Sequence, residues 1–159
     1  MRKIIAIVAA LGCIAGIYTF TASFLGLTMN KLGAKAVLLH LGIFALGIPL
    51  AFAERWGRGV NPFRGKPRWG LRRFQILFLL FVAIFFTFLA LSRTASPEIV
   101  NGAYVLRHGE TVEHILERDY LFLKGWELHL LASGWIVGYY ALTMHWWFPR
   151  QDEWTAVMP

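Results

Sequence analysis

Four long apolar segments constrain this chain more than any other feature of its sequence. They run from about residues 4 to 27, 34 to 53, 74 to 91 and 120 to 148. A helix rises about 1.5 Å per residue, so roughly 20 apolar residues cross the hydrocarbon core of a membrane, which is about 30 Å thick. The sequence therefore predicts an all-α membrane protein with four transmembrane helices, in one domain that spans residues 1–159.

The composition agrees with this class. Of the 159 residues, 57% are hydrophobic and 16% are charged, whereas soluble domains have about 45–50% apolar and about 25% charged residues. The difference excludes a disordered chain, a collagen-like chain and a typical water-soluble enzyme. The first apolar run is too long for the core of a cleaved signal peptide. The single cysteine, Cys13, is expected to be a small buried apolar residue.

Positive charge gathers in one connection, residues 54–73. Short loops rich in Lys and Arg stay in the cytoplasm, so both termini are expected there, with residues 28–33 and 94–119 on the outer side. The basic side chains serve as a topology signal, and they are also candidates to contact anionic lipid headgroups. Binding of nucleic acid is not expected, because the charge lies where the topology already requires it. These residues are Arg55, Arg58, Arg64, Lys66, Arg68, Arg72 and Arg73.

The outer segment, residues 94–119, predicts a small extracytoplasmic cap made of one β-hairpin and a helical extension. Two dipeptides compete for the hairpin turn, Asn101-Gly102 and His108-Gly109. The helical extension is expected to begin at Thr111 or Glu117, because apolar residues at helical spacing precede the fourth apolar segment.

The outer segment also carries a resemblance. The run Asn101-Gly-Ala-Tyr-Val-Leu-Arg-His-Gly109, followed by Glu117-Arg-Asp-Tyr120 and an aromatic fourth helix, resembles a pattern in uncharacterised small bacterial membrane proteins with four helices. It covers about a third of the chain and includes no catalytic spacing. The resemblance implies a location in the bacterial inner membrane, and it implies no activity, because that group has none assigned.

Ionisable residues inside membrane helices are costly, so they are candidates for function. His40 and Glu127 are predicted at similar depth, because each lies about the same distance inside a helix that enters from the outer side. Together they form a candidate proton relay. Arg93, at the outer end of the third apolar segment, is a competing partner for Glu127. The alternative is that these polar side chains only bond between helices or reach the membrane surface.

Two histidines are candidate axial ligands for a single b-type haem. His40 and His129 lie in the outer half of different predicted helices, which suits ligation from both faces of the ring. A metal bound by both Glu127 and His129 is disfavoured, because residues two apart on a helix point in nearly opposite directions. His145 is expected near the inner surface, without a histidine partner at that depth.

Helix packing is predicted from small and aromatic residues. Gly12 and Gly16 have the spacing of a close helix–helix contact, so the first helix is expected to pack tightly. The third segment is rich in phenylalanine and lacks such a pair, which suits lipid, another membrane protein or self-association.

Sequence motifs for catalysis are absent. The sequence has no cysteine pair, no phosphate-binding loop and no hydrolase or zinc-protease motif. We therefore expect an accessory or binding subunit of the membrane that acts through helix faces and the outer cap, without catalysis of its own. The first alternative is an oligomeric transporter or proton-coupled protein that uses His40 and Glu127. The second is a redox subunit with one haem held by His40 and His129.

Overall fold

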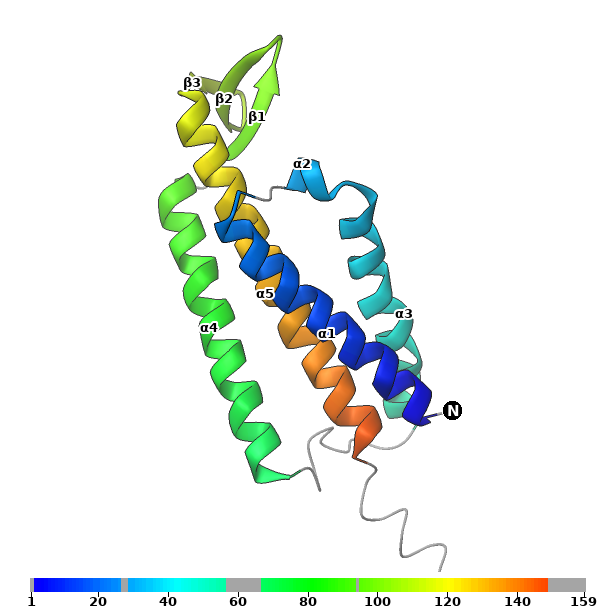
Figure 1. Cartoon of the computed structure of the whole chain (residues 1–159). Coiled ribbons are helices and arrows are strands. Elements are labelled where there is room, and N and C mark those ends of the chain that lie inside the picture. Colours follow the sequence, from blue (N-terminus) through cyan, green and yellow to red (C-terminus); the bar gives the residue numbers. More distant parts are fainter. Residues whose placement is uncertain (1, 27–28, 57–66, 94, 149–159) are drawn as a thin grey trace, which may run out of the picture.

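The computed structural model describes residues 2–26, 29–56, 67–93 and 95–148. The elements follow in the order α1 (Arg2–Phe24), α2 (Met29–Leu32), α3 (Ala34–Trp56), α4 (Arg68–Ser92), β1 (Ser96–Val100), β2 (Ala103–His108), β3 (Thr111–His114) and α5 (Glu117–Trp147). The long helices alternate in direction, and the sheet stands at the end of the bundle where α5 begins (Figure 1). The start of α1 and the end of α5 lie at the opposite end.

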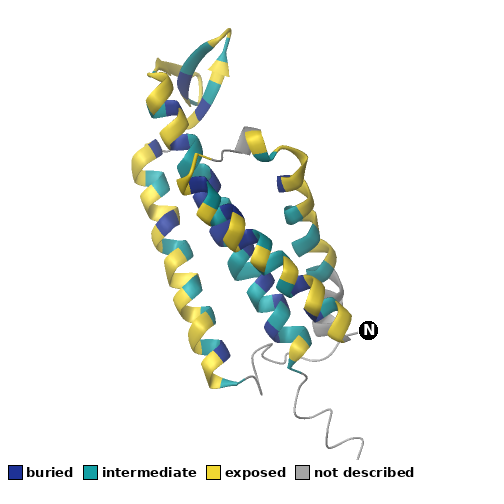
Figure 2. Cartoon of the chain, viewed as in Figure 1, coloured by how far each residue is buried: buried dark blue, intermediate teal, exposed yellow. Residues whose placement is uncertain are grey.

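Helix α5 is the centre of the bundle. It packs most extensively against α1, then against α4, and more lightly against α3. Its side chains Leu128, Ala132, Trp135 and Tyr139 form a buried core with small residues such as Ala9 of α1. Figure 2 shows that burial follows α5, whereas α4 is mostly exposed along its length. The apolar surface of α4 therefore faces away from the rest of the chain.

The structure is mostly helical, as predicted, but it reduces the number of candidate membrane spans. Among the described residues, two helical segments are long and apolar enough to cross a membrane, Lys3–Phe24 and Arg68–Ser92. The described apolar part of α3, Ala34–Gly47, is shorter. Helix α5 is long enough, but its many Trp, Tyr and His residues lower its hydropathy. The prediction of a mostly helical fold is thus confirmed. The prediction of four transmembrane helices is supported for two of them.

The predicted basic loop, residues 54–73, is helical at both ends. Helix α3 continues to Trp56, and α4 begins at Arg68 rather than at residue 74. Pro67 precedes α4 with a φ of −63°, a value that suits the entry to a helix. Arg68, Arg72 and Arg73 are therefore helical residues at the start of α4, not loop residues. Of the other predicted lipid contacts, Arg58, Arg64, Lys66 and the side chain of Arg55 lie outside the described residues.

The cap contains a three-stranded antiparallel sheet in the order β1-β2-β3. Both candidate turns occur, so the prediction of a single hairpin was wrong. Asn101 and Gly102 join β1 to β2 with φ values of 51° and 80°, and such positive values explain the Asn-Gly preference of two-residue turns. Gly109, with φ 59°, lies in the turn between β2 and β3. The strand at Thr111 excludes a helix there, and the predicted helix start at Glu117 is confirmed.

The cap is attached to the first turns of α5. Tyr104 of β2 donates a side-chain hydrogen bond to Glu117, and its ring lies 5.0 Å from that of Tyr120. Below them, Leu106 and Leu123 belong to a second buried cluster, separate from the bundle core. The helix that forms the centre of the bundle thus also carries the cap.

The bond between Tyr104 and Glu117 predicts a pH dependence of the cap. The carboxylate that accepts the bond raises the pKa of Tyr104 above its ordinary value of 10.0, and burial adds to the effect. The protonated phenol is the bonded form, so the contact is present below pH 10 and is lost as the pH rises through the raised pKa. The tyrosinate absorbance of Tyr104 is the difference between the wild-type protein and Tyr104→Phe. We expect this difference to develop above pH 10. Glu117→Gln should shift it back toward pH 10, and an unshifted curve would contradict the bond.

Candidate functional site

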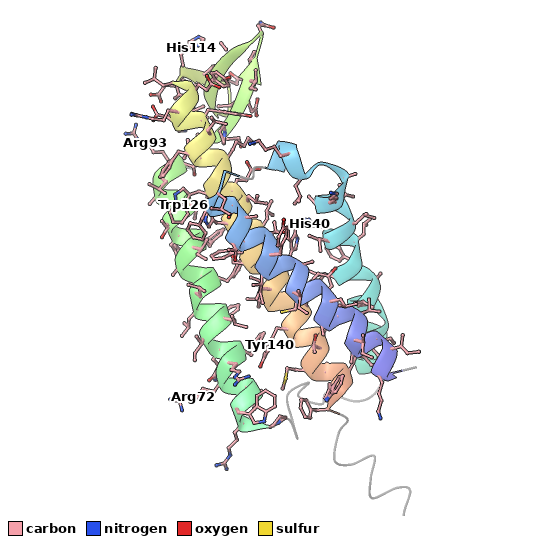
Figure 3. The ribbon with its side chains drawn as sticks, viewed as in Figure 1. His40, Arg72, Arg93, His114, Trp126 and Tyr140 are labelled. Carbon is pink, nitrogen blue, oxygen red and sulfur yellow. The ribbon has the colours of Figure 1, made fainter. Side chains whose placement is uncertain are left out.

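The side chains selected from the sequence are spread over different parts of the bundle. Figure 3 shows Arg93 and Trp126 in the half of the bundle toward the cap, and Arg72 and Tyr140 toward the opposite end, with His40 between α3 and the central helix. These side chains therefore belong to separate groups of contacts.

Glu127 forms an ion pair within its own helix. Its Oε2 lies 2.7 Å from Nζ of Lys124, and the two side chains are 30% and 17% exposed. The pair borders a cavity of about 260 Å³ between α5, the C-terminal end of α4 and the start of the cap, where Ser92 and Pro97 also lie. Sequence reasoning missed Lys124, although residues three apart on a helix are neighbours. The negative charge of Glu127 is thereby paired with Lys124 and not with His40.

Arg93 is the residue that ends α4. It adopts the left-handed conformation with φ 50°, and its backbone N–H donates to the carbonyl of Leu89. Its side chain is exposed. Lys124 is thus a partner of Glu127 that the sequence did not predict, and the role of Arg93 as a competing partner stays a prediction.

His40 contacts Trp135 of the central helix. The indole Nε1 donates to His40 Nδ1 at 3.2 Å, and the two rings meet edge to face at 87°. The carbonyl of Ala36 also lies 3.2 Å from Nδ1. Trp135 is only 2% exposed, so its N–H needs an acceptor, and we assign Nδ1 as that acceptor. Trp135 follows Glu127 by eight residues, about 12 Å along the helix. His40 and Glu127 thus contact α5 at different levels.

The bond between His40 and Trp135 predicts a stability effect. His40→Leu should lower the free energy of unfolding by about 1–2 kcal/mol, because the buried indole N–H loses its acceptor. Thermal unfolding of the detergent-solubilised protein measures this change. In a Trp135→Phe background no N–H remains, so the same substitution at position 40 should then have little effect. Equal losses in both backgrounds would show that the hydrogen bond contributes nothing.

His129 has one satisfied and one unsatisfied ring nitrogen. Nδ1 lies 2.7 Å from the carbonyl oxygen of Gly125. A carbonyl only accepts, so Nδ1 carries the proton and Nε2 is left as a lone pair. Among the described residues, buried Nε2 has no hydrogen-bond partner. The rings of Phe20, Phe24 and Trp126 surround the imidazole, with centroids 5.2, 4.1 and 5.4 Å away.

His129 borders a cavity of about 580 Å³ in the half of the bundle toward the cap. The residues that line it come from α1, the α1–α2 connection, α2 and α5: Ser23, Phe24, Gly26, Lys31, Leu121, Phe122, Gly125, Trp126 and His129. His40 borders another cavity, of about 370 Å³, between α3, α4 and α5. No residue lines both cavities. The two predicted haem ligands therefore border separate cavities, and their ligation of a haem stays a prediction.

Neither a metal site nor a comparison with known proteins adds a functional assignment to these residues. In the parts of the chain that the structure describes, no group of three or more His, Cys, Asp or Glu side chains is arranged to hold a metal ion. Comparison with family models, with curated proteins and with solved structures gives no match. Among the described residues, three groups could bind a ligand or exchange a proton. They are the ion pair of Lys124 with Glu127, the bond of Trp135 with His40, and the lone pair of His129.

Proposed function

We propose that this chain is a bacterial inner-membrane protein in which all four long helices cross the bilayer. Helices α1 and α4 have the length and apolar composition of spans. Helix α5 is less apolar, but α1, α3 and α4 pack around it and keep much of it from lipid. The alternating directions then put the cap on one side and the start of α1 on the other.

The distribution of charge indicates the orientation of the bundle in the membrane. Arg68, Arg72 and Arg73 begin α4 at the end of the bundle opposite the cap, and basic residues favour the cytoplasmic side. On this view both termini are cytoplasmic and the cap is extracytoplasmic. The Arg73 guanidinium lies 5.1 Å from the centre of the Trp69 ring, which combines a cation with an aromatic side chain that favours the headgroup layer. These residues are the proposed contacts with anionic lipid.

We propose further that the protein is an accessory or binding subunit without catalysis of its own. The observation that carries this is the continuity of α5, which holds both the buried cluster beneath the cap and the core of the bundle. A partner bound to the cap would therefore act directly on the central helix. The cap offers an edge for such a partner, because all four residues of β3 are exposed and only β2 pairs with it.

Two measurements test this proposal. In a Cys13→Ala background, Glu113→Cys should react with a membrane-impermeant maleimide on intact cells, whereas Arg72→Cys should react only after lysis. Protein extracted from its native membrane in mild detergent should migrate as a complex larger than the monomer. Val112→Lys on β3 should dissociate that complex, and Leu116→Lys, at a side chain that is more exposed (66% against 42%) but lies outside the strand, should not. A wild-type protein that is strictly monomeric would overturn the accessory role.

A proton-coupled role for Glu127 remains the alternative function. The observation in its favour is the cavity of about 260 Å³ beside the ion pair, which is lined by Ser92 and Ser96 as well as apolar residues. This role predicts that Glu127→Gln abolishes transport at unchanged expression. The contact of His40 with Trp135 makes His40 a less direct participant than the sequence suggested.

A further inference from the structure

The cavity beside His129 has the size of a small-molecule site. Its volume of about 580 Å³ lies within the range of about 300–1,000 Å³ that is typical of such sites. Its walls are mostly apolar, and three of its lining side chains are the aromatic residues Phe24, Phe122 and Trp126. Flat rings pack favourably against such side chains, edge to face or offset. The shape and lining of the cavity thus favour an apolar ligand with a ring.

His129 determines which polar group a ligand of this cavity must carry. The side chain is only 8% exposed, and Nε2 finds no hydrogen-bond partner among the described residues. Because Nδ1–H already donates to Gly125, Nε2 can only accept from a ligand while the ring is neutral. A buried acceptor without a donor is unfavourable. The group that satisfies it must be a hydroxyl or an N–H, and a ketone oxygen does not serve.

The position of the cavity suits a ligand that dissolves in the membrane. It lies between the outer ends of α1 and α5, with Lys31 of the short helix α2 at its border. The Lys31 ammonium donates to the carbonyl of Gly26 at 3.1 Å, so it links α2 to the residues that follow α1 at the border of the cavity. There is open space next to Gly125, since a Cβ built on it meets no atom within 4 Å. A ring can therefore lie over this glycine beside the imidazole, and its hydroxyl reaches the buried Nε2 when the aromatic rings around it shift.

We propose that this cavity binds a membrane-soluble molecule with a hydroxylated aromatic ring, of the quinol class, whose hydroxyl donates to His129 Nε2. The ring lies among Phe24, Phe122 and Trp126, and the apolar tail extends toward lipid. The site is independent of the accessory role, since it needs neither a partner nor the cap edge. His129 discriminates the reduced ligand from the oxidised one, because a quinone carries carbonyl oxygens and no hydroxyl donor.

The test is binding of a decyl-tailed quinol, kept reduced, to the full-length protein in detergent, measured by isothermal titration calorimetry. The quinol should bind about tenfold more tightly than the corresponding quinone, a ratio typical of one hydrogen bond to a buried acceptor. His129→Phe should remove this preference. Gly125→Leu should fill the cavity and abolish binding of both forms.

Gly47→Leu is the matched control for the filled cavity. Gly47 is also a helical glycine beside open space, but it lies on α3 and does not line this cavity. Quinol binding should be unchanged in this variant. Three results would overturn the proposal: equal binding of quinol and quinone, binding of decanol as tight as that of quinol, or wild-type binding by Gly125→Leu. A Soret band after expression with haem would also overturn it, because Nε2 would then be an iron ligand.

Discussion

Replacing Gly12 by leucine is expected to destabilise the bundle by about 2–3 kcal/mol, because overpacking a close contact forces helices apart. A Cβ built on Gly12 would overlap the ring of Tyr139, and one built on Gly42 would overlap the Tyr139 hydroxyl. That hydroxyl donates to the carbonyl of Leu39 at 2.8 Å. Tyr139 therefore joins α1, α3 and α5 at one point, and both glycines make room for it.

The chain contains its own reporter for this contact. Cys13, next to Gly12, is half-buried, and its thiol lies 3.8 Å from the carbonyl of Ile136 on α5. In Gly12→Leu, thermal unfolding followed by circular dichroism should shift to lower temperature, and Cys13 should react faster with a membrane-permeant maleimide. Gly47→Leu introduces the same side chain beside open space and should change neither measurement. An unaltered Cys13 labelling rate in Gly12→Leu would show that α1 does not pack on α5 through this glycine.

Features that depend on nearby residues were predictable from the sequence. The close packing expected of Gly12 and Gly16 is confirmed, because a Cβ at Gly12 would meet Tyr139 and one at Gly16 would meet Ile136 and Trp135 of α5. The turn at Asn101-Gly102 and the start of α5 at Glu117 were each one of two alternatives that the local sequence offered, and the structure contains both. The local pattern of small, polar and apolar residues determines where a helix or a turn occurs.

Contacts between elements were not predictable in the same way. His40 and Glu127 were placed at one depth by counting from the outer ends of two apolar segments. That count does not give the rotation of α3 and α5 about their axes, or their relative shift. The structure turns His40 toward Trp135 and leaves Glu127 beside the start of the cap. The aromatic surroundings of His129 were missed as well, because Phe20 and Phe24 come from a helix more than a hundred positions earlier.

Removing either partner of the ion pair of Lys124 and Glu127 is expected to lower the stability of the protein substantially. Removing one partner leaves the other charge unpaired in a partly buried position, so Lys124→Gln and Glu127→Gln should each cost about 2 kcal/mol, less than the 3–5 kcal/mol of a fully buried pair. The double variant should recover most of this loss, since two amides can bond to each other without charge. Thermal unfolding of the four proteins gives the coupling energy directly.

The pair of Arg107 and Glu98 in the cap provides the control. Its atoms lie 2.9 Å apart, close to the 2.7 Å of Lys124 and Glu127, but its side chains are 42% and 40% exposed instead of 17% and 30%. The same cycle there should give a coupling below about 1 kcal/mol, as for exposed pairs. Equal coupling in both pairs would contradict a special environment for Glu127. If the double variant regains stability but not transport, while Lys124→Gln alone still transports, the acidic group of Glu127 is what transport requires, because the fold of the double variant is then intact.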